Sequence, residues 1–146
     1  MTLPRMTIVT LGVTDLELST TFYRMVFGIH PNSDFDGIAF FELPGVWLAL
    51  YPLDKLAEDI DPGLAFDRTG GFRGMTLAYN ARSKDEVLAI FDHVAQAGAT
   101  IAKPPQDTFW GGFSGYFADP DGFHWEVAWG PMFDHAPDGS LRFRSA

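Results

Sequence analysis

The sequence of 146 residues contains no cysteine, which excludes disulfide bonds, thiolate metal ligands and a cysteine nucleophile. No apolar run reaches the roughly 18 residues that a membrane-spanning helix needs. The first residues also lack the basic-then-apolar order of a secretory signal peptide. These absences together predict a cytoplasmic protein.

Basic residues are scarce as well, because 10 Lys and Arg stand against 19 Asp and Glu, for a net charge of −9. An acidic surface repels phosphate backbones and anionic lipids, so we expect neither a nucleic-acid partner nor a membrane partner. The same charge favours solubility and would attract a cationic ligand. Aromatic residues are abundant, at 15% of the chain. They can fill a core, line an apolar pocket, or do both.

The same order of predicted strands and helix occurs twice along the chain. Each half opens with an alternating apolar strand, followed by a capping-box pair that predicts a helix and a glycine that ends it. Thr14 corresponds to Ser83 at an offset of 69 residues, and Ala49 corresponds to Glu126 at an offset of 77. The predicted elements are strands 6–13, 29–31, 37–43 and 46–51 with helices 14–27 and 53–60 in the first half, and strands 74–80, 100–103, 113–118 and 123–129 with a helix from Ser83 to Gly98 in the second.

This repeat predicts an α+β fold built from two tandem β-α-β-β-β modules, which form a concave mixed sheet with the helices outside. We expect a single domain over residues 1–146. Module one covers about 6–60, module two covers about 74–131, and a loop over 61–73 joins them. The polar residues 132–146 are expected to form a surface tail.

Two motifs carry a family resemblance. They are Leu11-Gly-Val-Thr-Asp-Leu16 with Phe22-Tyr23, and Gly115-Tyr-Phe-Ala-Asp-Pro-Asp-Gly-Phe-His-Trp-Glu-Val127. Both resemble the vicinal oxygen chelate superfamily, which groups glyoxalase I, bleomycin-resistance proteins and extradiol dioxygenases. The resemblance implies the paired-module fold. It also implies a homodimer, because proteins of this family commonly complete or flank their binding cup with a partner chain, and open sheet edges favour pairing.

The resemblance further implies a divalent metal held by one His, Glu or Gln on each of four strands. At the four corresponding positions this chain has Ile8, Ala49, Gly74 and Glu126. The first three offer no donor side chain, so we expect no metal cofactor, and a His124–Glu126 pair would supply only two ligands. Where glutathione-handling relatives carry an arginine this chain has Gly12, which argues against a glutathione adduct as substrate.

We expect the concave surface to bind a small molecule around Glu126, unless its aromatic side chains simply pack together. Arg73 and Lys103 flank predicted strand ends and are expected to be surface charges rather than anion clamps. Ile8, Ala49 and Gly74 would leave space where related enzymes hold a metal. The residues expected to line the cup are Thr10, Trp47, Tyr51, Thr76, Asn80, Trp110, Tyr116 and His124.

Three functions remain open at this point. The first is metal-free binding of a small aromatic or cationic molecule. The second is a metal-independent lyase or isomerase that uses Glu126 as general base, since burial among aromatic rings disfavours the charged carboxylate. The third is a glyoxalase- or dioxygenase-type metalloenzyme with a non-standard site.

Overall fold

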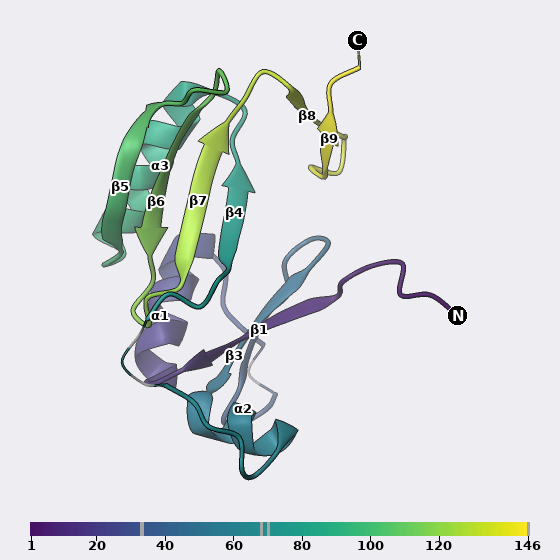
Figure 1. The fold of residues 1–146 in the computed structure, drawn as a ribbon, viewed down its shortest axis with the longest axis vertical. Helices are drawn as coiled ribbons and strands as arrows, with labels where there is room; N and C mark the ends of the chain where they lie inside the picture. Colours follow the sequence, from purple (N-terminus) through teal and green to yellow (C-terminus); the bar gives the residue numbers. More distant parts are fainter. Residues whose placement is uncertain (33, 68, 70, 146) are drawn as a thin grey trace. The chain divides into compact units, whose positions relative to one another are not determined.

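The chain folds into two compact units, Met1–Gly71 and Phe72–Ala146 (Figure 1). The structure is a computed structural model that describes residues 1–32, 34–67, 69 and 71–145. Its helices, together with sheets that contain both parallel and antiparallel strand pairs, confirm the predicted α+β fold class. The first unit contains β1 (Ile8–Val13), α1 (Leu16–Phe27), β2 (Ala39–Phe41), β3 (Trp47–Pro52) and α2 (Leu53–Ile60). The second contains β4 (Thr76–Asn80), α3 (Lys84–Gln96), β5 (Thr100–Asp107), β6 (Phe113–Ala118), β7 (His124–Trp129), β8 (Phe133–His135) and β9 (Leu141–Phe143).

The sheet of the first unit has the strand order β1-β3-β2, with β1 parallel and β2 antiparallel to β3. An aromatic cluster forms its core between α1 and the sheet. Phe27 stacks on Tyr23 and meets the edge of Phe41, with 5.5 Å between ring centroids in both pairs. On β1, a Cβ added at Gly12 would lie 2.7 Å from Leu53 Cδ1, so α2 packs where any side chain at this position would stand.

Two predictions for the first unit are corrected. Helix α1 is capped by Asp15 rather than Thr14, because Asp15 has an extended backbone and its Oδ1 accepts a hydrogen bond from the Leu18 amide at 3.0 Å. The strand predicted over 29–31 is replaced by a single bridge between Asn32 and Phe40. The end of α1 is as predicted, with Gly28 in the left-handed conformation at φ 69°.

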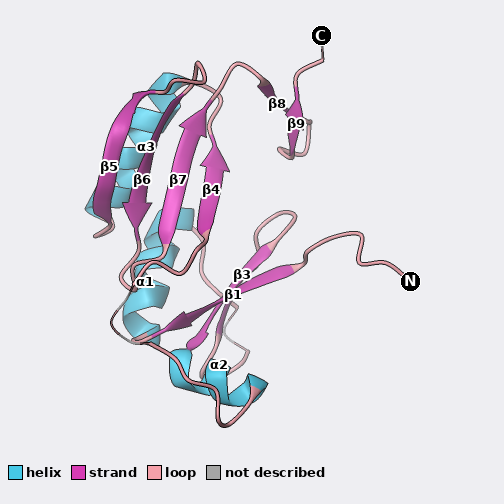
Figure 2. Cartoon of the chain, in the orientation of Figure 1, coloured by secondary structure: helices cyan, strands magenta, loops and turns pink. Residues whose placement is uncertain are grey.

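The sheet of the second unit has the strand order β4-β7-β6-β5, and only the β4–β7 pair is parallel. Helix α3 covers one face of this sheet (Figure 2). Phe91 of α3 meets the edge of Phe117, with centroids 6.4 Å apart, and Phe117 stacks on Trp125. The other face carries the alternate residues of each strand, among them Glu126.

The N-terminus of α3 follows the predicted cap in part. Ser83 Oγ accepts a hydrogen bond from the Glu86 amide at 3.1 Å. The Glu86 carboxylate, however, accepts from the Arg82 amide at 2.5 Å, one residue before the partner that a capping box uses.

The predicted turn over Asp119-Pro-Asp-Gly122 joins β6 to β7. The Gly122 amide donates to the Asp119 carbonyl at 3.0 Å, and Gly122 has φ 81°, where a side chain would be strained. The buried Asp119 carboxylate accepts from the Phe123 amide at 2.8 Å. This turn fixes the register that sets Glu126 opposite Tyr116.

Strand lengths in the second unit also differ from the prediction. Strand β4 begins at Thr76, so Gly74 lies before the strand rather than on it. Strand β5 runs to Asp107, past Pro104 and Pro105, and prolines are tolerated there because β5 is an edge strand. Lys103 therefore lies inside β5 and not at a strand end.

The expected surface tail is a β-hairpin. Strands β8 and β9 pair antiparallel, and Gly139, at φ 88°, closes the turn by donating to the Ala136 carbonyl at 2.8 Å. Among the described residues, no helix is both long and apolar enough to cross a membrane.

Candidate functional site

Glu126 lies in the middle of β7 on the sheet face opposite α3. Its neighbours across the sheet are Ala78 on β4 and Tyr116 on β6. The Tyr116 hydroxyl donates a hydrogen bond to Glu126 Oε2 at 3.0 Å. Partial burial raises the pKa of Tyr116 above its ordinary value, and the hydrogen bond to Glu126 and the charge of that carboxylate act in the same direction. The hydroxyl therefore stays protonated at neutral pH and keeps donating to the carboxylate.

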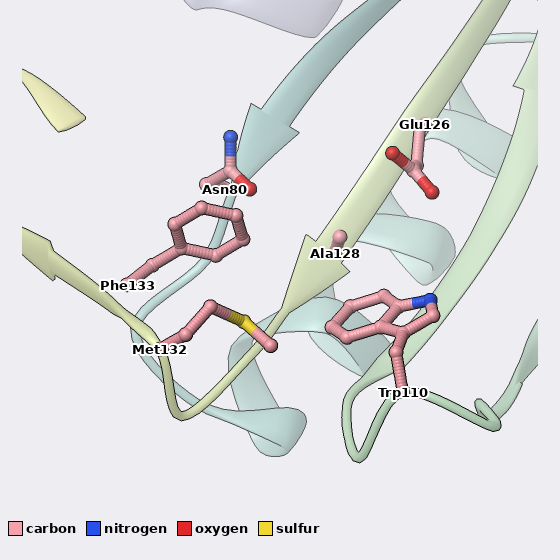
Figure 3. Close-up of a pocket in the computed structure, with 6 residues that line it drawn as sticks. All are labelled: Asn80, Trp110, Glu126, Ala128, Met132 and Phe133. Atoms are coloured by element: carbon pink, nitrogen blue, oxygen red, sulfur yellow. The ribbon is translucent and has the colours of Figure 1, made fainter. Parts of the chain in front are cut away.

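A cavity of about 410 Å³ opens beside Glu126 (Figure 3). Two of its lining residues, Asn80 and Glu126, are polar. The others are Trp110, Ala128, Met132 and Phe133. A carboxylate among aromatic and thioether side chains suits a ligand that has a cationic group on an apolar body.

Trp110 is held at the cavity by the loop between β5 and β6. The Thr108 amide donates to the Gly112 carbonyl, and the Gly112 amide donates to Thr108 Oγ1, both at 2.9 Å. A Cβ added at Gly112 would lie 1.9 Å from Trp110 Cζ3, and one added at Gly130 would lie 2.8 Å from the same atom. The indole thus occupies space that two glycines leave open.

The C-terminal hairpin provides the opposite wall. The Met132 carbonyl accepts a hydrogen bond from the Arg144 amide at 2.8 Å, which fixes the backbone of Met132. Phe133 stacks on Phe143, with 5.6 Å between ring centroids. His135 Nε2 donates to the Asn80 carbonyl at 3.0 Å, which links the hairpin to the end of β4.

The structure brings some of the predicted residues together on this sheet face. Asn80, Trp110 and Glu126 line the cavity, and Tyr116 holds Glu126. Thr76 and His124 pair with each other two positions before the Ala78–Glu126 pair, and they lie outside the lining residues. The His124 ring packs against the edge of Phe72, with centroids 5.9 Å apart.

The predicted residues of the first unit are described within that unit alone. Ile8 and Trp47 line a second cavity, of about 460 Å³, together with Asn32, Phe35, Ile38 and Phe40. Thr10, Ala49 and Tyr51 are on the same two strands but do not line it, and Ala49 is completely buried. Within each unit taken by itself, predicted residues thus line a cavity with a carboxylate in the second unit and an apolar cavity in the first.

Met132 and Phe133 were not expected in the site because the residues after 131 were interpreted as a surface tail. The sequence did carry a signal for the hairpin. Apolar and polar residues alternate in Leu141-Arg-Phe143, and Pro137-Asp-Gly139 just before it is a turn signal.

The donor set at the four family metal positions does not fit a divalent metal. Ile8 lies opposite Trp47, two residues before Ala49, and Thr76 lies opposite His124, two residues before Glu126. The strand register thus makes Thr76, rather than Gly74, the counterpart of Ile8. Isoleucine and alanine donate nothing, which leaves one hydroxyl and one carboxylate. Among the described residues, no three His, Cys, Asp or Glu side chains form a cluster that could hold a metal ion.

Comparisons with known proteins agree with this architecture. A glyoxalase-related enzyme from Fulvimarina pelagi has a similar structure, with a TM-score of 0.85 and 36% identity over 98% of this chain and 100% of that one. A glyoxalase/bleomycin resistance protein/dioxygenase from Nocardioides superposes with a TM-score of 0.72 and 31% identity, over 88% of this chain and 85% of that one. A curated relative, metallothiol transferase FosB of Lysinibacillus sphaericus, is 31% identical over 124 residues, which are 84% of this chain and 80% of the relative. The family profile described as Glyoxalase/Bleomycin resistance protein/Dioxygenase superfamily matches residues 5–127, and the chain belongs to this superfamily, as its motifs predicted.

Proposed function

We propose that this protein binds a small organic cation with an aromatic or other flat apolar body in the Glu126 cavity, without a metal. The observation that carries the proposal is a single carboxylate, held by the Tyr116 hydroxyl, on the wall of a cavity whose other walls include Trp110, Met132 and Phe133.

Each wall has a role in this proposal. The faces of Trp110 and Phe133 attract a cation through the quadrupoles of their rings and also cover an apolar body. Glu126 provides the negative charge that orients the cation. Tyr116 fixes the carboxylate by one oxygen, so a ligand meets an acceptor that is already in position.

The similar proteins include enzymes, by the names that they carry. A relative is named a metallothiol transferase, and a similar structure is described as a glyoxalase-related enzyme. Metal-dependent chemistry of the family type would need donors at Ile8 and Ala49, which this chain lacks. We therefore rank binding above catalysis, because the remaining Glu126–Tyr116 pair can hold a ligand without a metal.

Catalysis by Glu126 is the second candidate. The observation that favours it is the Tyr116 hydroxyl within hydrogen-bond distance of the carboxylate. Once Glu126 has removed a proton from the substrate, Tyr116 could give its own proton to another atom of the substrate and recover one from the protonated Glu126 carboxyl. This would make the protein a metal-independent lyase or isomerase. Conversion of a bound molecule that is lost in Glu126→Gln while binding persists would favour this second candidate.

Isothermal titration with two probes of one shape tests the binding proposal. The probes are 2-phenylethylamine, protonated at pH 7, and the neutral 2-phenylethanol. Glu126→Gln should weaken the amine by about 1.5–3 kcal/mol, roughly 10- to 150-fold, and leave the alcohol unchanged. Trp110→Ala should weaken both probes. Glu58→Gln, which removes the same charge from exposed α2, is the matched control.

The proposal is wrong if Glu126→Gln and Trp110→Ala both leave the affinity for the amine at the wild-type value. It is also wrong if Glu58→Gln weakens the amine as much as Glu126→Gln does. That result would mean that overall charge, rather than the carboxylate in the cavity, attracts the probe.

A further inference from the structure

We infer that Lys103 adds an anion subsite to the Glu126 cavity, so that the ligand carries an acidic group as well as a cationic one. This inference rests on the proposed function and specifies its ligand class. It starts from a row of side chains across the second sheet. Lys103 on β5 pairs with Tyr116 on β6, and Tyr116 pairs with Glu126 on β7.

An irregularity in β5 brings Lys103 into this row. Ile101 pairs with Phe117, which packs on Phe91 of α3, so Ile101 lies on the helix side of the sheet. Regular alternation would put Lys103, two residues later, on that side too. The register instead shifts between Ile101 and Lys103, and Lys103 pairs with Tyr116. One extra residue in the strand therefore turns the lysine to the face that carries Glu126.

The strand returns to the pairing with Phe113 only after a second shift, between Lys103 and Gln106. Two irregularities thus flank one lysine in a strand of eight residues. Bulges are frequent next to binding and active sites because they re-aim individual side chains. An edge strand that needed only to end the sheet would not require Lys103 to be turned toward Tyr116.

The Lys103 ammonium has no counter-ion among the residues that the structure describes. Lys84 ends on Asp107 at 2.8 Å, whereas no ion pair or side-chain hydrogen bond joins the Lys103 ammonium to any other described residue. The Lys103 side chain is exposed, and the Tyr116 hydroxyl is engaged with Glu126. The row therefore presents a cation and an anion on one face, separated by a tyrosine.

The spacing of this row sets the ligand class. Neighbouring strands lie about 4.8 Å apart, so the backbones at Lys103 and Glu126 are about 10 Å apart. A simple anion is disfavoured by the net charge of −9, and a simple cation has no use for Lys103. A zwitterion satisfies both ends, with its ammonium at Glu126 and its carboxylate or phosphate at Lys103.

Isothermal titration with 4-(2-aminoethyl)benzoate and its methyl ester tests this inference. The two probes share the amine and the ring, and only the first has a carboxylate. In the wild-type protein the acid should bind about two- to fivefold more tightly than the ester, as expected for an exposed ion pair. Lys103→Met keeps most of the side-chain volume and should remove this preference without changing the affinity for the ester. Lys103→Glu should reverse the preference.

Lys55→Met is the matched control, because Lys55 is an exposed lysine on α2 of the other unit. The inference is overturned if Lys103→Met leaves the preference for the acid intact, or if Lys55→Met removes it equally. The Glu126→Gln variant distinguishes failure of this inference from failure of the proposed function. If Glu126→Gln weakens both probes while Lys103→Met changes neither, the proposed function stands and the inference falls. If Glu126→Gln changes neither probe, or neither probe binds, the proposed function falls and the inference falls with it.

Discussion

Replacing Gly112 by alanine should displace the Trp110 indole from its position in the cavity wall. The added methyl group would lie 1.9 Å from Trp110 Cζ3, 2.2 Å from its Cη2 and 2.6 Å from the Trp129 carbonyl oxygen. Real Cβ atoms essentially never come within 3.0 Å of such neighbours. The Trp129 oxygen belongs to the backbone of β7, so the indole is the group that must move.

The expected cost is that of overpacking, about 1–3 kcal/mol in the free energy of unfolding. Urea unfolding followed by tryptophan fluorescence measures it, and the same samples report the environment of the displaced indole. Titration with 2-phenylethylamine should show a loss of affinity close to that of Trp110→Ala, although the substituted residue is outside the cavity lining.

A double-mutant cycle isolates the contact between the methyl group and the indole. In a Trp110→Ala background, Gly112→Ala should cost clearly less than in the wild type, because only the clash with the Trp129 oxygen remains. Equal costs in the two backgrounds, together with an unchanged affinity in the single variant, would refute the idea that Gly112 positions Trp110.

Four further outcomes follow from the structure. Light scattering should show a dimer at micromolar concentration, because β4 and β5 end the sheet of the second unit and edge strands favour pairing, and a monomer would contradict this. Elemental analysis of the purified protein should find no stoichiometric Zn, Ni, Mn or Fe; about one ion per chain, lost on Glu126→Ala, would contradict the metal-free proposal. Ser83→Ala should lower the free energy of unfolding by about 0.5–2 kcal/mol in urea, since the α3 cap is lost. The pKa of Tyr116 is raised in the folded state, so its contribution to stability is constant below the ordinary pKa of 10.0 and falls as pH rises through the higher folded value. Tyr116→Phe should therefore lose less stability than the wild type above pH 10. Parallel curves of unfolding free energy against pH for the two proteins would contradict this.

The regular parts of the fold were predictable because each depends on a local signal. The amphipathic stripe and serine cap specify α3, and α2 covers the predicted residues Leu53–Ile60. The cap of α1 was placed one residue early because Thr14 and Asp15 are both good N-cap residues, and only the backbone conformation decides between them. The strand predicted over 29–31 failed because a short apolar run does not reveal how many cross-strand bonds it will form.

The site was predictable where strand alternation governs it, and at Trp110, which was expected to line the cup although it is not on a strand. Alternation on β7 and β4 placed Glu126 and Asn80 on one face, and the family resemblance singled out Glu126 as the one donor at the four metal positions. Lys103 was expected at a strand end, and alternation could not have placed it on this face, because bulges leave no reliable mark in a single sequence. Alternation could not place Met132 or Phe133 either, since their position depends on how a hairpin packs back on the sheet.

The hairpin places part of the cavity wall outside the sheet that carries Glu126. Two of the lining side chains, Met132 and Phe133, come after residue 127, where the match to the family ends. They are attached by a two-stranded ribbon, which is marginal on its own and contributes little to the α3–sheet core. Substitutions in this ribbon can therefore accumulate at small cost in folding free energy while they reshape one side of the cavity. If the proposed site binds its ligand as argued above, exchanging residues 131–146 between related chains should change the ligand preference while β4 to β7 stay the same.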